Sequence, residues 1–286
     1  MSDLERLVAR LEQLAERVDS WLPVSRPAIN WEAVAYRWRR PGQGRGFLEA
    51  IAHPHNITLD DLLGIERQKT ELERNTRQFL AGLPANNALL WGSRGTGKSS
   101  LIKGLLTRYA DAGLRVIEVD RSDLCDLPEI VAPLYARDER YVIFSDDLSF
   151  EADDPSYKAL KATIEGSLSA PPENVLIYAT SNRRHLLPEY QRENQDTQLI
   201  DGEIHHGEAV EEKISLSERF GLWLAFHPFS QDQYLAIAEQ YVKNLGAGIF
   251  DDQARAEALR WALTRGSRSG RVAWQFARDW VGRQSI

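Results

Sequence analysis

The stretch NALLWGSRGTGKSS, residues 87–100, joins a short apolar run to a glycine-rich turn. The run NALLW is typical of a buried strand, and the apolar side chains after Lys98 recur at helical spacing. The turn matches the pattern G-x-x-x-x-G-K-[ST], with Gly92, Gly97, Lys98 and Ser99 at its fixed positions. Because the match lies between a strand and a helix, it predicts a loop whose backbone N–H groups enclose phosphate oxygens.

The side chains of this loop have separate expected roles. Lys98 is expected to reach the β- and γ-phosphates of a nucleoside triphosphate, and the Ser99 hydroxyl is placed to ligate Mg²⁺. The strand–loop–helix context disfavours the alternative, a glycine-rich turn without a ligand. We therefore predict ATP and Mg²⁺ as cofactors. The loop residues expected to contact the nucleotide are Gly92, Ser93, Arg94, Gly95, Thr96, Gly97, Lys98, Ser99 and Ser100.

A second apolar run ends on two adjacent carboxylates. In YVIFSDD, residues 141–147, Asp146 and Asp147 follow a strand-like run. In a phosphate-loop fold a neighbouring strand delivers an acid that helps to hold Mg²⁺, and Asp146 is our candidate for this metal-side carboxylate. Asp147 is the candidate that orients the attacking water. Glu151 and Glu165 are alternative bases without this strand-end placement, and an Asp-rich surface turn would not explain the apolar lead-in.

Apolar runs alternate with helical patterns from about residue 56 to residue 229. The expected strands are NALLW, RVIEV, YVIFS, NVLIYAT and LWLAF, at 87–91, 115–119, 141–145, 174–180 and 222–226. Such alternation predicts a three-layer α/β fold, with a parallel sheet of five core strands covered by helices on both sides. From Ser230 onward a small helical domain is expected, with helices near 231–245, 252–264 and 270–283.

Residues 1–55 are expected to form an N-terminal helical and linker segment, followed by domains at 56–229 and 230–286. Six apolar residues from Leu4 to Trp21 follow a heptad pattern, which predicts an amphipathic helix packed on this protein or on a neighbouring subunit. Three arginines then surround Trp38, and these residues could contact nucleic acid by charge and stacking. We favour a linker whose aromatic residues dock on the main domain. The arginines are Arg37, Arg39 and Arg40.

Composition excludes several classes of protein. The net charge of −7 argues against a globally basic nucleic-acid binder. No apolar run approaches the roughly 18 residues that suggest a membrane span, and the charged N-terminus disfavours a signal peptide. The single cysteine, Cys125, excludes an internal disulfide and fits a reducing, cytoplasmic compartment. We expect it to be a buried structural thiol.

Charge is unevenly distributed along the chain. Eight acidic residues and one basic residue lie between Glu189 and Glu212, whereas six arginines and one acid follow from Arg260 onward. The chain could therefore still have a local basic surface despite its negative net charge. The acidic insert is expected to be a solvated loop or hairpin that tunes assembly or a partner contact. A metal site there is the alternative, but its candidate ligands lack a recognisable spacing; they are Glu203, His205, His206 and Glu208.

In these motifs and their order, the chain resembles the AAA+ ATPases over about residues 56–286. The segment before the phosphate loop resembles the part of the family whose Gly-hydrophobic pair, here Gly64 and Ile65, lies against adenine. IYATSN resembles the strand that ends in the sensor-1 residue, which implies that Asn182 lies near the γ-phosphate. The alternative for Asn182 is a cap on the following helix.

Two arginines follow from the same resemblance. LSERF, residues 216–220, stands where the family places its arginine finger, which implies that Arg219 reaches the γ-phosphate of a neighbouring subunit. SGRVAWQF resembles the sensor-2 motif and implies a nucleotide contact for Arg271, with Arg268 as second choice. A surface ion pair is the alternative for Arg219, and a solvated lid position is the alternative for Arg271. The catalytic residues implied are Lys98, Asp147, Asn182 and Arg219.

The two stretches PANNALLWGSRGTGKSSL and FSDDLSFE resemble the sequences of an uncharacterised bacterial AAA+-type ATP-binding family. The adjacent aspartates also resemble those of AAA+ replication initiators and helicase loaders. The resemblance implies an Mg²⁺-dependent ATPase, a homo-oligomer that couples its ATP state to an unknown protein partner. The alternatives are a slow-hydrolysing switch or loader acting on DNA or replication proteins, and a small-molecule kinase. Nucleic acid stays open but is not favoured, and no membrane partner is expected.

Overall fold

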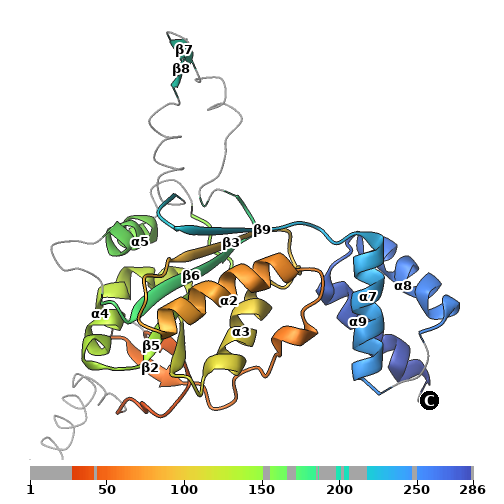
Figure 1. Cartoon of the computed structure of the whole chain (residues 1–286), viewed down its shortest axis with the longest axis horizontal. Helices are drawn as coiled ribbons and strands as arrows, with labels where there is room; N and C mark the ends of the chain where they lie inside the picture. Colours follow the sequence, from red (N-terminus) through yellow and green to blue (C-terminus); the bar gives the residue numbers. More distant parts are fainter. Residues whose placement is uncertain are drawn as a thin grey trace, which may run out of the picture.

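The predicted sheet is present and is wider than expected. In the computed structural model, residues 28–41, 44–150, 155–165, 172–184, 186, 198–200, 203–205, 218–246 and 250–284 are described. These residues form a sheet of seven strands in the order β2-β1-β4-β5-β6-β3-β9 (Figure 1). Its strands are β1 (Ala35–Arg39), β2 (Phe47–Ala50), β3 (Ala88–Gly92), β4 (Leu114–Glu118), β5 (Arg140–Ser145), β6 (Val175–Ser181) and β9 (Leu222–Phe226).

The five strands expected from the apolar runs correspond to β3, β4, β5, β6 and β9, and all pair in parallel. Helices and 3-10 turns precede β3 and occupy connections between these five strands. These are η1 (Leu59–Asp61), α2 (Glu66–Leu80), α3 (Lys98–Tyr109), η2 (Arg121–Asp126), α4 (Leu127–Val131), η3 (Ala132–Ala136) and α5 (Pro155–Glu165). Among the described residues, no helix is both long and apolar enough to cross a membrane.

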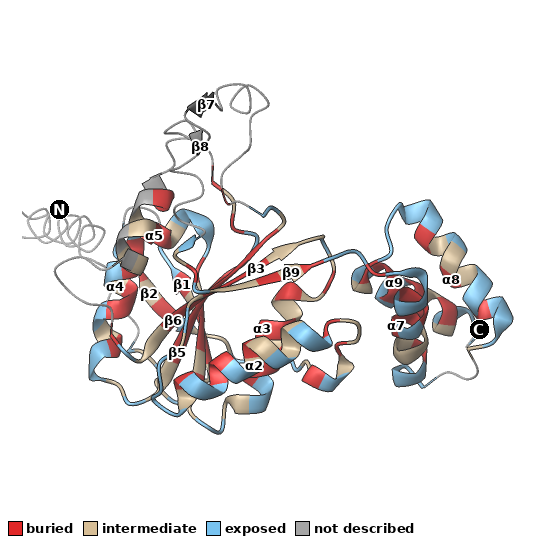
Figure 2. Ribbon diagram, turned by 45° about the horizontal axis from the view of Figure 1, so that its top comes forward, coloured by how far each residue is buried: buried red, intermediate tan, exposed pale blue. Residues whose placement is uncertain are grey.

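The strands send alternate side chains into two cores, one on each face of the sheet. Leu90 and Phe144 belong to the core that is covered by α2 and α3, whereas Leu89 and Ile143 belong to the core that is covered by η2, α4 and α5 (Figure 2). Because strand side chains point to opposite faces in turn, both faces of a central strand can be apolar only when both are covered. The predicted three-layer arrangement is therefore confirmed.

Two of the seven strands come from a segment that we expected to be a linker. Tyr36 of β1 lies opposite Ile117 of β4 in a parallel pair, and β2 adds to β1 in antiparallel fashion. Trp38 is buried, and its indole N–H donates to the Asp126 carboxylate at 2.9 Å, which also pairs with Arg40 at 2.8 Å. Docking of the aromatic residue is confirmed. The linker interpretation is wrong for these strands, and the sheet begins before residue 56.

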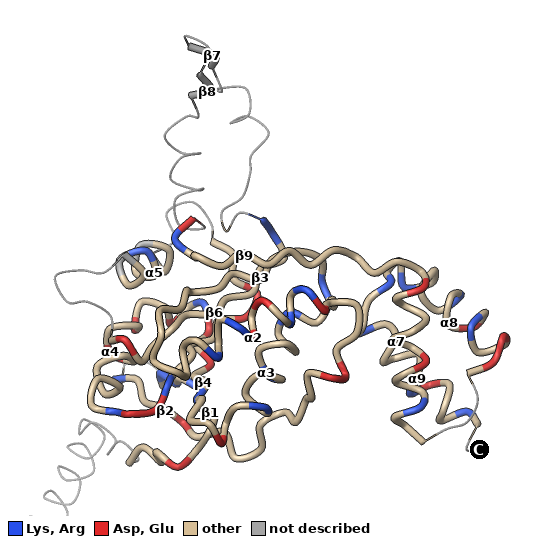
Figure 3. The backbone as a smooth tube through the Cα atoms, in the orientation of Figure 1, with Lys and Arg blue, Asp and Glu red and all other residues tan. Residues whose placement is uncertain are grey.

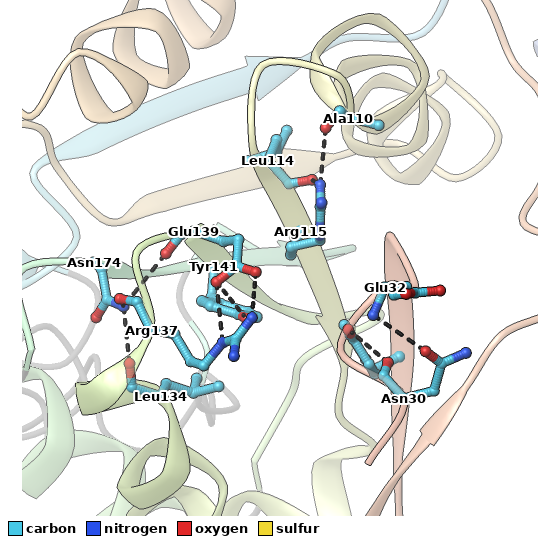
Figure 4. Close-up of polar contacts among 11 residues, drawn as sticks. Asn30, Glu32, Ala110, Leu114, Arg115, Leu134, Arg137, Glu139, Tyr141 and Asn174 are labelled. Carbon is cyan, nitrogen blue, oxygen red and sulfur yellow. Dashed lines mark hydrogen bonds and ion pairs between the residues drawn. The ribbon is translucent and has the colours of Figure 1, made fainter.

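The edge of the sheet where β4 and β5 begin is fixed by polar side chains (Figure 4). The Arg115 guanidinium donates to the carbonyls of Ala110 and Leu114 at 2.8 and 2.9 Å. The Asn174 amide donates to the Leu134 carbonyl at 2.9 Å. These bonds hold the loops that enter the strands. The opposite edge, where the strands end, is the usual place for a ligand in a parallel α/β sheet.

The three expected lid helices begin as predicted and end within one residue of the predicted positions: α7 (Gln231–Asn244), α8 (Asp252–Arg265) and α9 (Gly270–Gln284). Ser230 caps α7, since its side chain accepts from the N–H of Gln233 while the Gln233 side chain accepts from the N–H of Ser230. Phe276 is buried inside the lid and stacks on Trp280 with ring centres 5.8 Å apart. Local capping and one apolar core explain why these helices could be read from sequence.

The prediction of a buried thiol at position 125 is wrong. Cys125 is exposed, and its sulfur lies 3.9 Å from the Ser156 hydroxyl. The neighbouring Leu124 and Asp126 are both buried and occupy the inward positions of η2. In such a short turn, adjacent residues cannot all face the core.

Two other expectations fall largely outside the described residues. The heptad helix lies within residues 1–27, which are not described. Of the acidic insert, β7 (Gln198–Ile200) and β8 (Glu203–His205) are described, and they pair in antiparallel fashion. The pairing fits the expected hairpin. His206 and Glu208 lie outside the described residues, within which no group of three or more His, Cys, Asp or Glu could hold a metal.

Candidate functional site

A cleft of about 610 Å³ lies between the phosphate loop, the ends of β5 and β6, and the lid. Its polar lining includes loop residues 94–100 together with Asp146, Asp147 and Asn182. Its apolar lining includes Ile65 from the segment before α2. The lid and its approach add further apolar side chains, namely Phe229, Ile237, Tyr241 and Trp274. One end can therefore accept phosphate and metal, while the other offers apolar surface for a ring.

The Lys98 ammonium lies at the centre of the polar lining. It donates to the carbonyls of Gly92 and Ser93 at 2.8 and 2.7 Å and to the side-chain carbonyl of Asn182 at 3.2 Å. Burial lowers the pKa of Lys98 from its usual value, and two nearby aspartate carboxylates oppose that shift. The position matches the role expected of a lysine that meets phosphate oxygens.

Ser99 and Asp146 supply two oxygen atoms of the kind that Mg²⁺ prefers. The Ser99 hydroxyl donates to a carboxylate oxygen of Asp146 at 2.6 Å. Adjacent ligands of an octahedral Mg²⁺, with bonds of about 2.1 Å, are about 3 Å apart. Small side-chain adjustments would therefore let both oxygens face one ion, directly or through water. The two predicted metal-side residues are brought together, and their chemistry fits the metal.

Asp147 occupies a backbone conformation that few residues adopt. Its φ is +52°, in the left-handed region, and no other non-glycine residue among the described ones has a positive φ. Asp and Asn are enriched there because their short polar side chains bond locally, whereas longer side chains gain no such compensation. This explains why Asp, rather than the longer Glu, is suited to position 147.

Asn182 links the lysine to the second carboxylate. Its side-chain carbonyl accepts from Lys98, and its amide N–H donates to an Asp147 carboxylate oxygen. The side chain therefore lies in the cleft beside Lys98, while its contact with a γ-phosphate stays a prediction. Helix capping was the alternative, and the described contacts of Asn182 do not include it.

Three residues of the predicted nucleotide set lie beside the cleft rather than in its lining. A Cβ on Gly92, whose φ is +127°, would lie 2.1 Å from the Phe226 carbonyl oxygen, so glycine permits the close approach of β3 and β9. The Ser93 N–H donates to the same carbonyl at 2.9 Å. Gly64, with φ +77°, packs against Phe229. For Gly92, the structural requirement is backbone packing.

The lid touches the phosphate loop directly. The backbone N–H of Gly270 donates to the carbonyl of Gly95 at 2.8 Å, and a Cβ on Gly95 would lie 3.0 Å from Ser269. Arg271, the first choice for the sensor-2 arginine, lines the cleft, whereas Arg268 is not part of that lining. The first choice is therefore the better placed of the two.

Arg219 lies away from the cleft. It precedes β9, at the edge where the strands begin, and lines a separate cavity of about 480 Å³ together with Arg140 and Gly221. The phosphate loop follows β3, which is parallel to β9, so the loop lies at the opposite edge. Arg219 therefore does not lie near the phosphate loop of its own chain.

Among the cleft-lining residues that the motifs missed are Thr180, Tyr241 and Trp274. Trp274 follows Arg271 by three positions on α9, and residues at this spacing share a helix face, so its placement could have been inferred. Tyr241 comes from a different helix, and its ring meets that of Trp274 edge to face with centres 5.2 Å apart. Thr180 gave no sequence signal beyond its place in an apolar strand.

The fold is similar to that of solved AAA+ proteins. The Holliday junction branch migration motor RuvB of Thermotoga maritima matches with a TM-score of 0.54 and 16% identity, over 79% of this chain and 64% of RuvB, slightly less than two thirds. For a point mutant of the same RuvB the TM-score is 0.57 and the identity 17%, with coverages of 80% and 67%. ORC1 of Aeropyrum pernix in complex with DNA matches with a TM-score of 0.51 and 19% identity, over 74% of this chain and 57% of ORC1. The TM-scores show a shared AAA+ fold, and at such low identities the likeness extends to the fold alone.

Comparison with curated proteins gave no match. A family model described as "Protein of unknown function (DUF815)" matches residues 31–284, which include the sheet from β1 onward, the phosphate loop and the lid. The match confirms the predicted resemblance to an uncharacterised AAA+-type family. With most of its length matched by this model and with an AAA+ fold, the chain belongs to the DUF815 family.

Proposed function

We propose that this protein binds and hydrolyses ATP with Mg²⁺ in a homo-oligomer, and that its ATP state is coupled to a protein partner in the cytoplasm. One observation carries the proposal: Lys98, the Ser99–Asp146 pair and Asp147 meet in a single cleft beside the lid. A phosphate-binding lysine, a pair of metal-side oxygens and a second carboxylate are the parts that phosphoryl transfer to water requires.

Each residue has a distinct task in the proposed reaction. Lys98 and the loop N–H groups bind the phosphates, and Ser99 and Asp146 would hold Mg²⁺, which neutralises charge that develops on the phosphate oxygens. Asp147 orients a water molecule and accepts its proton as the water oxygen bonds to the γ-phosphorus. The bond between that phosphorus and the oxygen bridging to the β-phosphate breaks, which releases ADP and inorganic phosphate.

The direct test is phosphate release from ATP by the purified full-length chain, with Mg²⁺ and with excess EDTA. Lys98→Ala serves as the control for contaminating ATPases. We expect release that requires both Mg²⁺ and Lys98. Release by the unmodified chain that does not exceed the Lys98→Ala background, at every protein concentration, would overturn the proposal.

Trp274 is proposed to cover the base of the nucleotide, opposite Ile65. It is 39% exposed where it lines the cleft, and stacking of a base on an aromatic ring is worth roughly 1–3 kcal/mol. Trp274→Ala is expected to weaken ATP binding by about 10-fold, with little change for inorganic tripolyphosphate, which lacks a base. Calorimetry measures both, with the exposed lid variant Leu263→Ala as control. Equal losses for the two ligands would contradict base recognition.

Slow hydrolysis, as in an ATP-controlled switch, is the second candidate. The contact between Asn182 and Asp147 favours it, since a carboxylate engaged by an amide has less freedom to meet water. Turnover well above one per minute that candidate partners leave unchanged would count against the switch. Slow turnover accelerated by a partner would support it.

DNA remains a proposed partner that the charges do not favour. RuvB is a Holliday junction motor and the matched ORC1 is bound to DNA, which makes DNA worth testing. Charges of both signs are spread over the lid helices (Figure 3). Lid residues Arg260 and Arg283 pair with acids of their own helices at 2.7 and 2.5 Å, and Arg37 of β1 pairs with Glu118 at 2.6 Å. Salt-dependent DNA binding in the presence of ATP would be needed to retain this partner.

A further inference from the structure

One threonine at the end of β6 contacts the turn that carries both carboxylates. The Thr180 hydroxyl donates to a carboxylate oxygen of Asp146 at 2.5 Å and accepts from the backbone N–H of Asp147 at 2.9 Å. The backbone carbonyl of Thr180 accepts from the N–H of Leu148 at 2.6 Å. Thr180 is 1% exposed, whereas Asp146 and Asp147 are exposed, so the bonds join a buried anchor to two carboxylates that face the cleft. Three successive residues of the turn are thus held by one residue of the neighbouring strand.

The turn needs such support because regular pairing stops just before it. In the register between β5 and β6, the last pair is Ser145 with Ala179. The chain then changes direction, and Asp147 takes its left-handed conformation. Two adjacent carboxylates also repel each other, and a hydroxyl that donates to one and accepts from the backbone of the other fixes their relative direction.

The Thr180 contact differs in kind from the one made by Ser99. The Ser99 hydroxyl belongs to the phosphate loop and is proposed to turn toward Mg²⁺, so its bond to Asp146 would change when ATP binds. Thr180 comes from a central strand of the sheet, next to β5, and its side chain is buried. It can therefore hold Asp146 in place while the Ser99 contact changes.

We propose that Thr180 is a positioning residue that sets the orientation of Asp146 and Asp147 together. This inference rests on the proposed ATP hydrolysis. In this proposal Thr180 does not contact ATP. Its task is to keep the metal-side carboxylate and the water-orienting carboxylate in the geometry that hydrolysis requires, where a displacement of about 1 Å can cost about 100-fold in rate.

Two substitutions separate the hydroxyl from the volume of the side chain. Thr180→Val keeps the shape and removes both hydroxyl bonds, whereas Thr180→Ser keeps the hydroxyl. Thr76→Val is the matched control: the Thr76 hydroxyl is also fully buried, donates to the Leu72 carbonyl at 2.8 Å, and lies in α2 outside the cleft lining. Melting temperatures of Thr180→Val and Thr76→Val report the general cost of losing a buried hydroxyl, and that of Thr180→Ser reports the cost of losing the methyl group.

Steady-state kinetics give the first readout. We expect Thr180→Val to lower kcat for ATP roughly 10- to 100-fold with KM within about 2-fold of the unmodified chain, because positioning matters in the transition state more than in binding. Thr180→Ser and Thr76→Val should keep kcat within about 3-fold. Unchanged kcat in Thr180→Val, or an equal loss in Thr180→Ser, would overturn the positioning role.

Hydrogen exchange at the Asp147 amide gives a readout that needs neither ATP nor activity. The amide donates to the Thr180 hydroxyl at 2.9 Å and also to the Asp146 carboxylate at 3.1 Å, and that carboxylate is itself held by the Thr180 hydroxyl. Loss of the hydroxyl weakens both contacts, so exchange should accelerate about 10-fold or more in Thr180→Val and stay slow in Thr180→Ser and Thr76→Val. Equal exchange in Thr180→Val and the unmodified chain would refute the contact. If the unmodified chain hydrolyses no ATP, the proposed function fails by itself, while the exchange measurement still decides whether Thr180 holds the turn.

Discussion

Arg219→Ala is expected to lower ATP turnover by about 10³-fold or more while leaving ATP affinity nearly unchanged. An arginine that meets the γ-phosphate from a neighbouring subunit stabilises charge in the transition state and contributes about 10³–10⁵ in rate in related systems. Arg219 lies at the edge of the sheet where the strands begin, away from the cleft of its own chain. Phosphate release over a range of protein concentrations, together with calorimetric ATP binding, measures both quantities.

Mixing two inactive variants tests whether the arginine acts between subunits. In a mixture of the two variants, some subunit interfaces place the intact phosphate loop of an Arg219→Ala subunit against the intact arginine of a Lys98→Ala subunit. ATPase activity should therefore return. Arg140→Ala is the control because Arg140 lines the same cavity as Arg219, and it should retain activity. Unmodified turnover in Arg219→Ala at all concentrations, or no recovery on mixing, would rule out a finger in trans.

The second large effect is expected for Asp147→Asn, which should lower ATP turnover by about 10²–10⁴-fold, the usual contribution of a general base. Asn has almost the same shape and tolerates the left-handed conformation that Asp147 adopts, with φ +52°. It cannot accept the proton of the attacking water. ATP binding should persist, since the phosphate loop is untouched. Single-turnover hydrolysis and equilibrium ATP binding separate these two effects.

Glu165→Gln is the matched comparison for the Asp147 substitution. Glu165 is the alternative base considered from the sequence, and its replacement should leave turnover within about 3-fold. If Glu165→Gln is inactive while Asp147→Asn turns over ATP normally, the base has been assigned to the wrong carboxylate. Because Asp147→Asn should hold the ATP state, it is also the form best suited to capture the protein partner.

Local patterns were sufficient to predict much of this protein. The phosphate loop has fixed spacing because Lys98 and Ser99 must begin a helix directly after the turn. The five core strands are short apolar runs, and the lid helices have clear boundaries such as the Ser230 cap. The Asp146–Ser99 pair could be predicted because both residues follow strands that end at the same edge of a parallel sheet.

The linker interpretation failed because strand pairing at a sheet edge depends on distant partners. Tyr36 and Trp38 alternate inward as a strand requires, but the run is short and lies among Pro and Gly. Its assignment as β1 depends on pairing with β4, far along the chain. A short segment has little conformational preference of its own, so its tertiary surroundings decide whether it becomes a strand.

The sequence by itself determined the α/β core, the phosphate loop and the pair of acids, because short apolar runs and adjacent residues with a fixed spacing encode them. The order of these motifs along the chain carried the resemblance to AAA+ proteins. Only the tertiary structure decided that Thr180 holds both carboxylates, that Tyr241 lines the cleft, and that Arg219 lies at the opposite edge. These arrangements join residues from separate strands and helices. Their geometry follows from how the sheet and lid pack, which no local spacing in the chain specifies.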